Sequence, residues 1–166
     1  MVFNHLVWVR FCCLAAVGVG ALHGCGRNLK TYEGDVYIDR ADQIEEYRGY
    51  GIITGRVTIA ELEAEAFSWP ELVEIGGELW IWENSKLKGF NLAGLEKVGL
   101  SVLVRNNSEL VGINMSSLSE VGGSFAFAYN SKLPSCQVHG VVASVGSNKI
   151  SGETSVVGNN DNGLCQ

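Results

Sequence analysis

The side chains that could do chemistry are few and scattered along this chain of 166 residues. Outside the N-terminal leader described below, His139 is the only histidine, and no nucleophile motif of the Gly-x-Ser-x-Gly type is present. Catalysis needs a nucleophile, acid or base that is held beside partner groups. We therefore expect a protein that is not an enzyme, with no catalytic residues and no cofactor.

Two polar clusters are the remaining candidates for a carboxylate or metal site. Glu61, Glu63 and Glu65 alternate along the chain, which indicates a solvated face more readily than a catalytic pair. Residues 159–162 (Asn-Asn-Asp-Asn) are rich in the oxygen ligands that calcium prefers. Turn formation beside the flanking glycines explains the same residues. We expect no metal site.

The middle of the chain repeats itself every 23 residues without a gap. The copies begin at Ile75, Val98 and Val121, and read IGGELWIWENSKL, VGLSVLVRNNSEL and VGGSFAFAYNSKL. Looser copies at 34–38 and 55–59 precede them with spacings of 21 and 22 residues, and a weak further copy spans 146–150. Such self-similarity is the sequence signature of a solenoid.

Each repeat predicts one strand of about four residues whose alternate side chains face opposite ways. The inward side chains of three successive strands are Leu79 and Ile81, Val102 and Val104, and Phe125 and Phe127. The glycines before each strand permit a sharp corner, and stacked coils bury a continuous core. One asparagine per repeat predicts a structural ladder inside the stack, formed by Asn84, Asn107 and Asn130.

These features predict a mainly β fold, a right-handed parallel β solenoid of five to six coils with about 21–23 residues each. We expect the return segments, such as residues 90–98, to form short helical turns or irregular coil. No long helix is expected.

The side chains between the inward positions define the outer face of the predicted sheet. One outward column contains Tyr37, Thr58, Trp80, Leu103 and Ala126, and the other contains Asp39, Ala60, Trp82, Arg105 and Ala128. Adjacent strands lie about 4.8 Å apart, which places Trp80 beside Leu103 and Trp82 beside Arg105. Tryptophan and arginine are enriched at binding hot spots. The candidate binding patch is Tyr37, Trp80, Trp82, Leu103 and Arg105; packing that only stabilises the sheet, or a loop folded over it, is the alternative.

The N-terminus has the features of an export signal. An uncharged, mostly apolar run, residues 11–22, leads into Leu22-His23-Gly24-Cys25. This resembles the bacterial lipoprotein signal, in which small residues precede a lipidated cysteine, although His23 departs from the small residue expected there. The resemblance implies cleavage after Gly24 and a lipid anchor on Cys25. An ordinary secretory leader is the alternative, and the run is shorter than the roughly 20 residues of a membrane-spanning helix.

Cysteine usage is consistent with export. Of five cysteines, Cys12 and Cys13 lie in the expected leader. The lipoprotein resemblance implies that Cys25 carries the lipid. Cys136 and Cys165 remain, and an even pair in an oxidising compartment favours a disulfide. That bond would close a loop of about 30 residues and stabilise the fold by roughly 3–4 kcal/mol. Two buried free thiols are the alternative.

The repeat pattern is similar to that of the receptor L-domain family, the leucine-rich-repeat-like solenoids of insulin and epidermal growth factor receptor ectodomains. The pattern I-G-G-x-L-x-I-x-x-N-x-x-L matches best from Ile75 to Leu87, and the likeness runs from about Gly34 to the C-terminus. The tail, N-x-x-L-P-x-C ending at Cys136 and then Cys165, resembles the ending of bacterial lipoproteins with such repeats. The resemblance implies a Cys136–Cys165 bridge that caps the last coil.

Taken together, the sequence predicts three segments and a binding role. We expect a signal peptide over residues 1–24, a short linker over 25–33 and the solenoid over 34–166. The net charge of −6 argues against nucleic acid as a partner. The hypothesis is a lipoprotein of the bacterial outer membrane or cell surface, held in the membrane by its lipid, that binds an extracellular protein or glycan. A structural envelope component without a ligand and a polysaccharide-acting β-helix enzyme are the alternatives.

Overall fold

The computed structural model describes residues 28–165. The expected signal peptide and its lipidation site, Cys25, lie outside the described residues. The described elements, in chain order, are β1 (Lys30–Tyr32), β2 (Val36–Ile38), η1 (Ala41–Tyr47), β3 (Tyr50–Ile53), β4 (Val57–Ala60), β5 (Ala66–Ser68), β6 (Glu74–Ile75), β7 (Leu79–Trp82), β8 (Gly89–Asn91), β9 (Lys97–Val98), β10 (Val102–Arg105), β11 (Gly112–Asn114), β12 (Glu120–Val121), β13 (Phe125–Ala128), α1 (Ser135–Val145), η2 (Ser147–Lys149) and β14 (Thr154–Val157).

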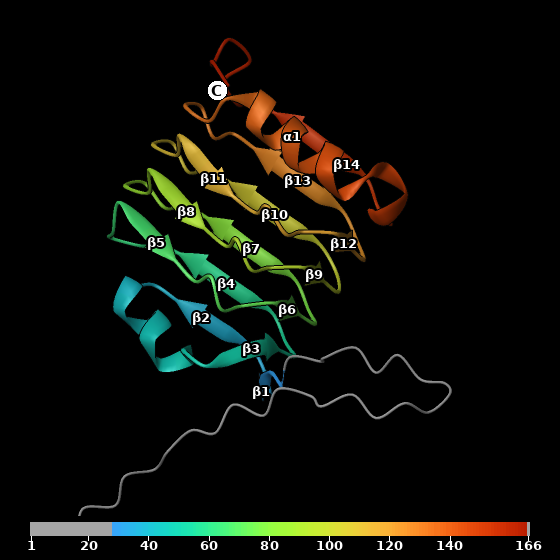
Figure 1. Ribbon diagram of the computed structural model, residues 1–166. Coiled ribbons are helices and arrows are strands. Elements are labelled where there is room, and N and C mark those ends of the chain that lie inside the picture. Colours follow the sequence, from blue (N-terminus) through green and yellow to red (C-terminus); the bar gives the residue numbers. More distant parts are fainter. Residues whose placement is uncertain (1–27, 166) are drawn as a thin grey trace, which may run out of the picture.

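The strands form three parallel sheets that wrap around one core, so the chain is a parallel β solenoid (Figure 1). Sheet A has the order β1-β3-β6-β9-β12, sheet B the order β2-β4-β7-β10-β13-β14, and sheet C the order β5-β8-β11. Each regular coil gives one strand to each sheet. The mainly β, parallel solenoid predicted from the repeat is therefore confirmed.

The number of coils is smaller than expected. The five strands of sheet A bound about four complete turns, instead of five to six coils. The weak copy at 146–150 is not another strand of sheet B; Ile150 forms a bridge with Val121, and the last strand of that sheet is β14. At the other end, β1 pairs with β3, so the solenoid begins inside the segment expected to be a linker.

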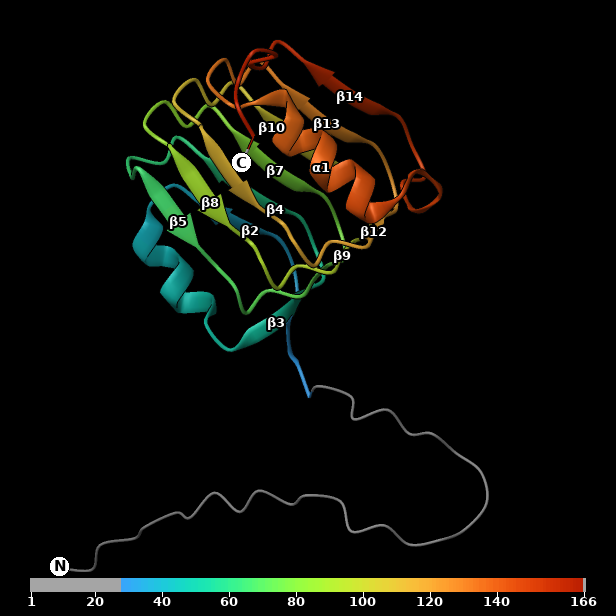
Figure 2. The same cartoon turned by 45° about the horizontal axis from the view of Figure 1, so that its top comes forward.

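The return side also differs from the prediction, because it contains strands and one real helix. The three strands of sheet C pair in register and thereby satisfy backbone groups that short helical turns would have bonded internally. In the last turn, α1 takes the position beside β11 (Figure 2). Its Gln137 amide replaces a neighbouring strand, because Oε1 accepts from the Ile113 N–H and Nε2 donates to the Val111 carbonyl oxygen. The helix α1 has 11 residues, which is an average length for a helix and more than the short helical turns that we expected.

The asparagine ladder lies inside the stack, as the repeat predicts. Asn84, Asn107 and Asn130 are fully buried. Each Nδ2 donates to the Oδ1 of the next asparagine, at 2.9 Å from Asn84 to Asn107 and 3.0 Å from Asn107 to Asn130. Asn159 continues the ladder, accepting from Asn130 at 3.1 Å. Its spacing of 29 residues from Asn130 hid it from the 23-residue pattern.

Glycines and residues in the left-handed conformation occupy different corners of the coils. A Cβ on Gly99 would lie 2.1 Å from the Gly76 carbonyl oxygen, and one on Gly122 would lie 2.0 Å from that of Gly99. These glycines have no positive φ, so close approach of the coils, and not the sharp turn we expected, requires them. The left-handed residues follow the strands of sheet B: Glu61, Glu83, Asn106 and Tyr129, with φ from 55° to 57°, and then Gly158 at 67°.

The predicted disulfide between Cys136 and Cys165 is present, with a Cα–Cα distance of 6.1 Å. It joins the first turn of α1 to the end of the chain. It differs in detail from the expected cap, because β14 and α1, not the bridge, cover the core of the last coil, where Val138 and Val145 are buried and Val156 is partly buried.

Candidate binding site on the outer face of sheet B

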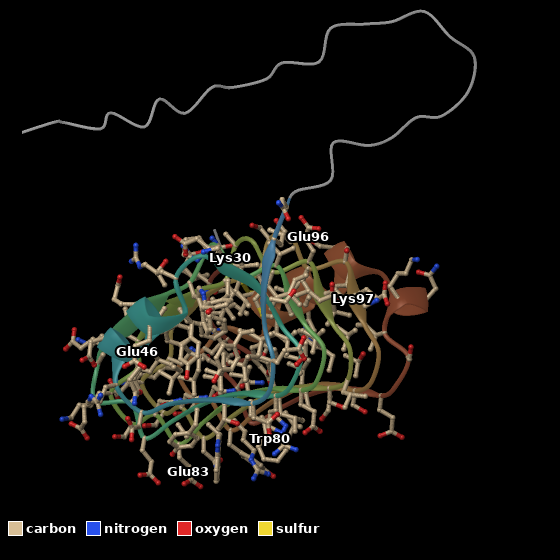
Figure 3. All side chains as sticks on the ribbon, turned by 90° about the horizontal axis from the view of Figure 1, so that it is seen from below. Lys30, Glu46, Trp80, Glu83, Glu96 and Lys97 are labelled. Carbon is tan, nitrogen blue, oxygen red and sulfur yellow. A yellow bond between two sulfur atoms is a disulfide. The ribbon has the colours of Figure 1, made fainter. Side chains whose placement is uncertain are left out.

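Strand β7 positions the two tryptophans of the candidate patch. Its sequence, Leu-Trp-Ile-Trp, alternates so that Leu79 and Ile81 are fully buried in the core while Trp80 and Trp82 face outward. The inward pair anchors the strand by burying aliphatic surface. Trp80 and Glu83 project from the same side of the molecule, opposite to Lys30 and Glu96 (Figure 3). The tryptophans are therefore held at a fixed spacing by a rigid strand.

The register of sheet B brings four predicted residues together. Trp80 pairs with Leu103, and Trp82 pairs with Arg105. Their side chains enclose a depression of about 150 Å³, which we call the Trp–Arg depression and define as Trp80, Trp82, Leu103 and Arg105. The predicted neighbour relations are thus confirmed.

Tyr37, the fifth predicted member, does not line the depression. It is in the same outward column, but the strand β4 separates it from β7 in the sheet. Its side chain is 52% exposed. Tyr37 therefore lies on the same face but outside the depression. A substitution of Tyr37 can serve as a control for substitutions within the depression.

An arginine that the sequence prediction missed supports Trp80 from the other side. The Arg56 guanidinium lies 4.3 Å from the centre of the Trp80 ring. Its Nε and one Nη each lie 2.8 Å from the Glu78 carboxylate. The opposite charges at a spacing of 22 residues, one coil, are the signal that could have revealed this pair. Since Arg56 comes from the β4 coil, the opposite face of the Trp80 ring is the one toward the depression.

Arg105 differs from Arg56 because its charge is not neutralised. The guanidinium lies 5.5 Å from the centre of the Trp82 ring, and within residues 28–165 it forms no ion pair. Stacking on an indole orients a guanidinium without using its five N–H donors. Arg105 is thus positioned to donate hydrogen bonds to two oxygens of an anionic group.

The indole N–H groups of Trp80 and Trp82 are also unsatisfied. Both Nε1 atoms are inaccessible to solvent and have no hydrogen-bond partner among the described residues. The N–H of Trp69, in the core, shares this state. A buried donor without a partner destabilises a fold by about 1–3 kcal/mol. Because the core residue Trp69 has the same unpaired N–H, this feature is common to core and surface indoles and does not by itself favour a binding role.

The other polar clusters have structural roles in the part of the chain that the structure describes. Glu63 and Glu65 form ion pairs with Lys86 and Lys88 on the next coil. Asn159 belongs to the ladder, and Asp161 accepts a hydrogen bond of 2.6 Å from the Ser135 hydroxyl. No group of three or more candidate metal ligands occurs among residues 28–165.

A second hollow crosses the outer side of sheet C. It is broad and open, with about 590 Å³, and Ala66, Gly89 and Gly112 form one of its rows. Phe67 and Phe90 are stacked beneath it, with ring centres 5.5 Å apart, and both are buried. Its other outward row is polar, with Ser68, Asn91 and Asn114. Asn91 Nδ2 donates to the Ser68 hydroxyl, and the Oδ1 atoms of Asn91 and Asn114 accept from the backbone two residues on, so these groups have structural partners.

No protein-family model matches the chain, and no curated protein is similar to it in sequence. The site must therefore be interpreted from its own geometry. None of the helices between residues 28 and 165 has the length and apolar character that crossing a membrane requires.

Proposed function

We propose that this protein is a non-catalytic binding protein of the cell envelope, which contacts an extracellular protein or glycan through the outer face of sheet B. The observation that carries the proposal is the Trp–Arg depression. It combines two rigidly spaced indoles, an aliphatic wall and a guanidinium without a carboxylate partner in the described chain. Exposed apolar surface next to an oriented charge is typical of interaction sites.

The proposal includes the finer fold and the location inferred from sequence. The solenoid is of the right-handed, receptor L-domain type, and the chain is exported and anchored through a lipid on Cys25 to a bacterial outer membrane or cell surface. The Cys136–Cys165 disulfide supports export, because such bonds persist in oxidising compartments. Nucleic acid is not a partner of a chain with a net charge of −6.

The two alternative functions would give different experimental results. A purely structural envelope component needs no depression between two half-buried tryptophans. Its loss would alter the envelope without abolishing any saturable binding. An enzyme acting on polysaccharide would release product from glycans, and mutation of surface carboxylates such as Glu83 would stop that release. Neither of these functions accounts for the unneutralised guanidinium beside Trp82.

The test is saturable binding by the mature protein to glycans and proteins of the cell surface, compared with two variants. We expect the double variant Trp80→Ala/Trp82→Ala to lose binding while its circular dichroism spectrum stays that of the native protein. Tyr37→Ala, on the same face but outside the depression, should bind normally. Equal binding by the wild type and the double variant would show that this face is not the site.

The anchor has a separate test. Mass spectrometry of the mature N-terminus should find Cys25 as the first residue with a lipid on its sulfur. A start at another residue, or an unmodified Cys25, would contradict the anchor and leave the binding proposal intact.

A further inference from the structure

The Trp–Arg depression has a size and a donor pattern that restrict its ligand. Pockets for drug-sized ligands have volumes of about 300–1,000 Å³, whereas the depression has about 150 Å³. It therefore accommodates a single ring or terminal group. Three of its four walls are the apolar side chains of Trp80, Trp82 and Leu103. The ligand must present an apolar face of the size of one ring.

The polar groups around the depression are hydrogen-bond donors at one end. Arg105 has only donors, and its planar fork matches two oxygens of a carboxylate. Glu78 does not compete for Arg105, because it is bonded to Arg56. A carboxylate on the ligand is the complement of this end.

A carboxylate acceptor lies next to Arg105, since the backbone N–H of Glu83 donates to the Arg105 carbonyl oxygen at 3.2 Å. Glu83 directly follows Trp82, projects from the same face as Trp80 (Figure 3) and forms no ion pair within residues 28–165. An ionised carboxylate only accepts hydrogen bonds, so it favours a ligand with hydroxyl donors. The ligand thus needs one carboxylate, several hydroxyl groups and an apolar ring face.

We propose that the Trp–Arg depression binds a hexuronic acid residue of a glycan. The inference rests on the proposed binding function and names its ligand class. The sugar ring lies against the indole faces, its carboxylate pairs with Arg105, and its hydroxyl groups point toward Glu83. A peptide is the less suitable ligand, because extended peptides bind sheets at their edges, and the strand β7 is paired on both sides by β4 and β10.

The experiment compares matched sugars on the full mature protein by titration calorimetry. The probes are trimers of galacturonate and of glucuronate, each with its carboxyl-reduced, neutral counterpart. We expect one uronate trimer to bind and its neutral counterpart to bind about tenfold to a hundredfold more weakly, as the loss of a charge-assisted hydrogen-bond pair predicts. Added salt should weaken only the binding of the uronate.

Variants assign the carboxylate to its partner. Arg105→Gln should reduce uronate affinity to that of the neutral trimer, and Arg105→Lys should recover part of it, since lysine keeps the charge without the planar fork. Tyr37→Ala is the matched control and should leave the affinity unchanged. Native circular dichroism spectra for all three variants show that each change acts on the ligand and not on folding.

The outcomes separate this inference from the broader proposal. If neither uronate trimer binds, or neutral and acidic trimers bind equally, the uronic acid assignment is wrong. The same is true if Arg105→Gln binds the uronate normally, or if a short peptide with a free C-terminal carboxylate binds through Arg105 in its place. In each case the proposed function still stands if Trp80→Ala/Trp82→Ala abolishes binding to cell-surface material.

Discussion

The core is covered in different ways in the middle coils and in the C-terminal turn. In the coils from β6 to β12, strands of all three sheets repeat at 23 residues and every ladder asparagine is fully buried. In the C-terminal turn, a helix replaces the strand of sheet C, the spacing of the ladder rises to 29 residues, and a disulfide holds the end. An internal coil has neighbours on both sides, whereas the last coil must compensate for the neighbour it lacks.

The largest effect should come from breaking the ladder in its middle. In Asn107→Ala, the buried Asn84 N–H and side-chain amide lose their shared acceptor, Asn107 Oδ1, and the Ile81 carbonyl oxygen loses its donor. With about 1–3 kcal/mol for each unsatisfied buried group, we expect the free energy of unfolding to fall by about 4 kcal/mol in urea denaturation.

The same change in the C-terminal turn should be milder. Asn159→Ala removes equivalent bonds from Asn130 and Phe127, but Asn159 is only partly buried, so water can replace them. We expect a loss of about 1–2 kcal/mol. Ser108→Ala, an exposed neighbour of the ladder, should have little effect. Equal losses for Asn107→Ala and Asn159→Ala would contradict the distinction between the two regions.

This contrast also explains how much the sequence could predict. In the middle coils, the alternation of Leu79, Trp80, Ile81 and Trp82 fixes which side chains face the core, and the period fixes their neighbours on the next coil. The parallel solenoid and the members of the Trp–Arg depression followed from those two regularities. The disulfide followed from cysteine counting and was confirmed.

Other features depend on contacts that no period describes. The helix α1 forms because Gln137 can bond to β11 in place of a strand, and this pairing is visible only in three dimensions. Arg56 was missed because it precedes its strand and reaches Trp80 from an adjacent coil. The left-handed conformation of Glu83 also escaped, because glutamate gives no local signal for a positive φ.

Removal of the disulfide should destabilise the C-terminal turn more than the middle coils. The bond spans 29 residues, and in the chain-entropy model its loss reduces stability by roughly 3–4 kcal/mol. In Cys136→Ser/Cys165→Ser, hydrogen exchange should accelerate in α1 and β14, while the amides of β7 and β10 stay protected. A uniform loss of protection throughout residues 28–165 would mean that the C-terminal turn and the middle coils unfold as one unit.

A methyl group added between two middle coils should lower the free energy of unfolding by a smaller amount. Gly99→Ala puts a Cβ 2.1 Å from the Gly76 carbonyl oxygen, so two coils must move apart. We expect a loss of about 2 kcal/mol, as for other overpacked sites. Gly112→Ala is the control, since nothing lies within 4 Å of its Cβ. Thermal denaturation of both variants measures the difference, and equal melting temperatures would exclude close approach as the reason for glycine at 99.

The smallest effect should have opposite signs in the two regions. The left-handed position after a sheet B strand is occupied by Glu83 in the middle and by Gly158 in the C-terminal turn. A residue with a Cβ is less stable there than glycine by about 1 kcal/mol, so Glu83→Gly should raise stability by that amount. Gly158→Ala should lower it by a similar amount, because its φ is 67° and its Cβ would also meet the Tyr129 ring. Urea midpoints that move in the same direction for both variants would rule out backbone conformation as the common cause. If the midpoints move apart as expected, Glu83 is held at a conformational cost that glycine would remove. The same cost then applies at the equivalent positions of the neighbouring coils, where Glu61, Asn106 and Tyr129 have φ between 55° and 57°.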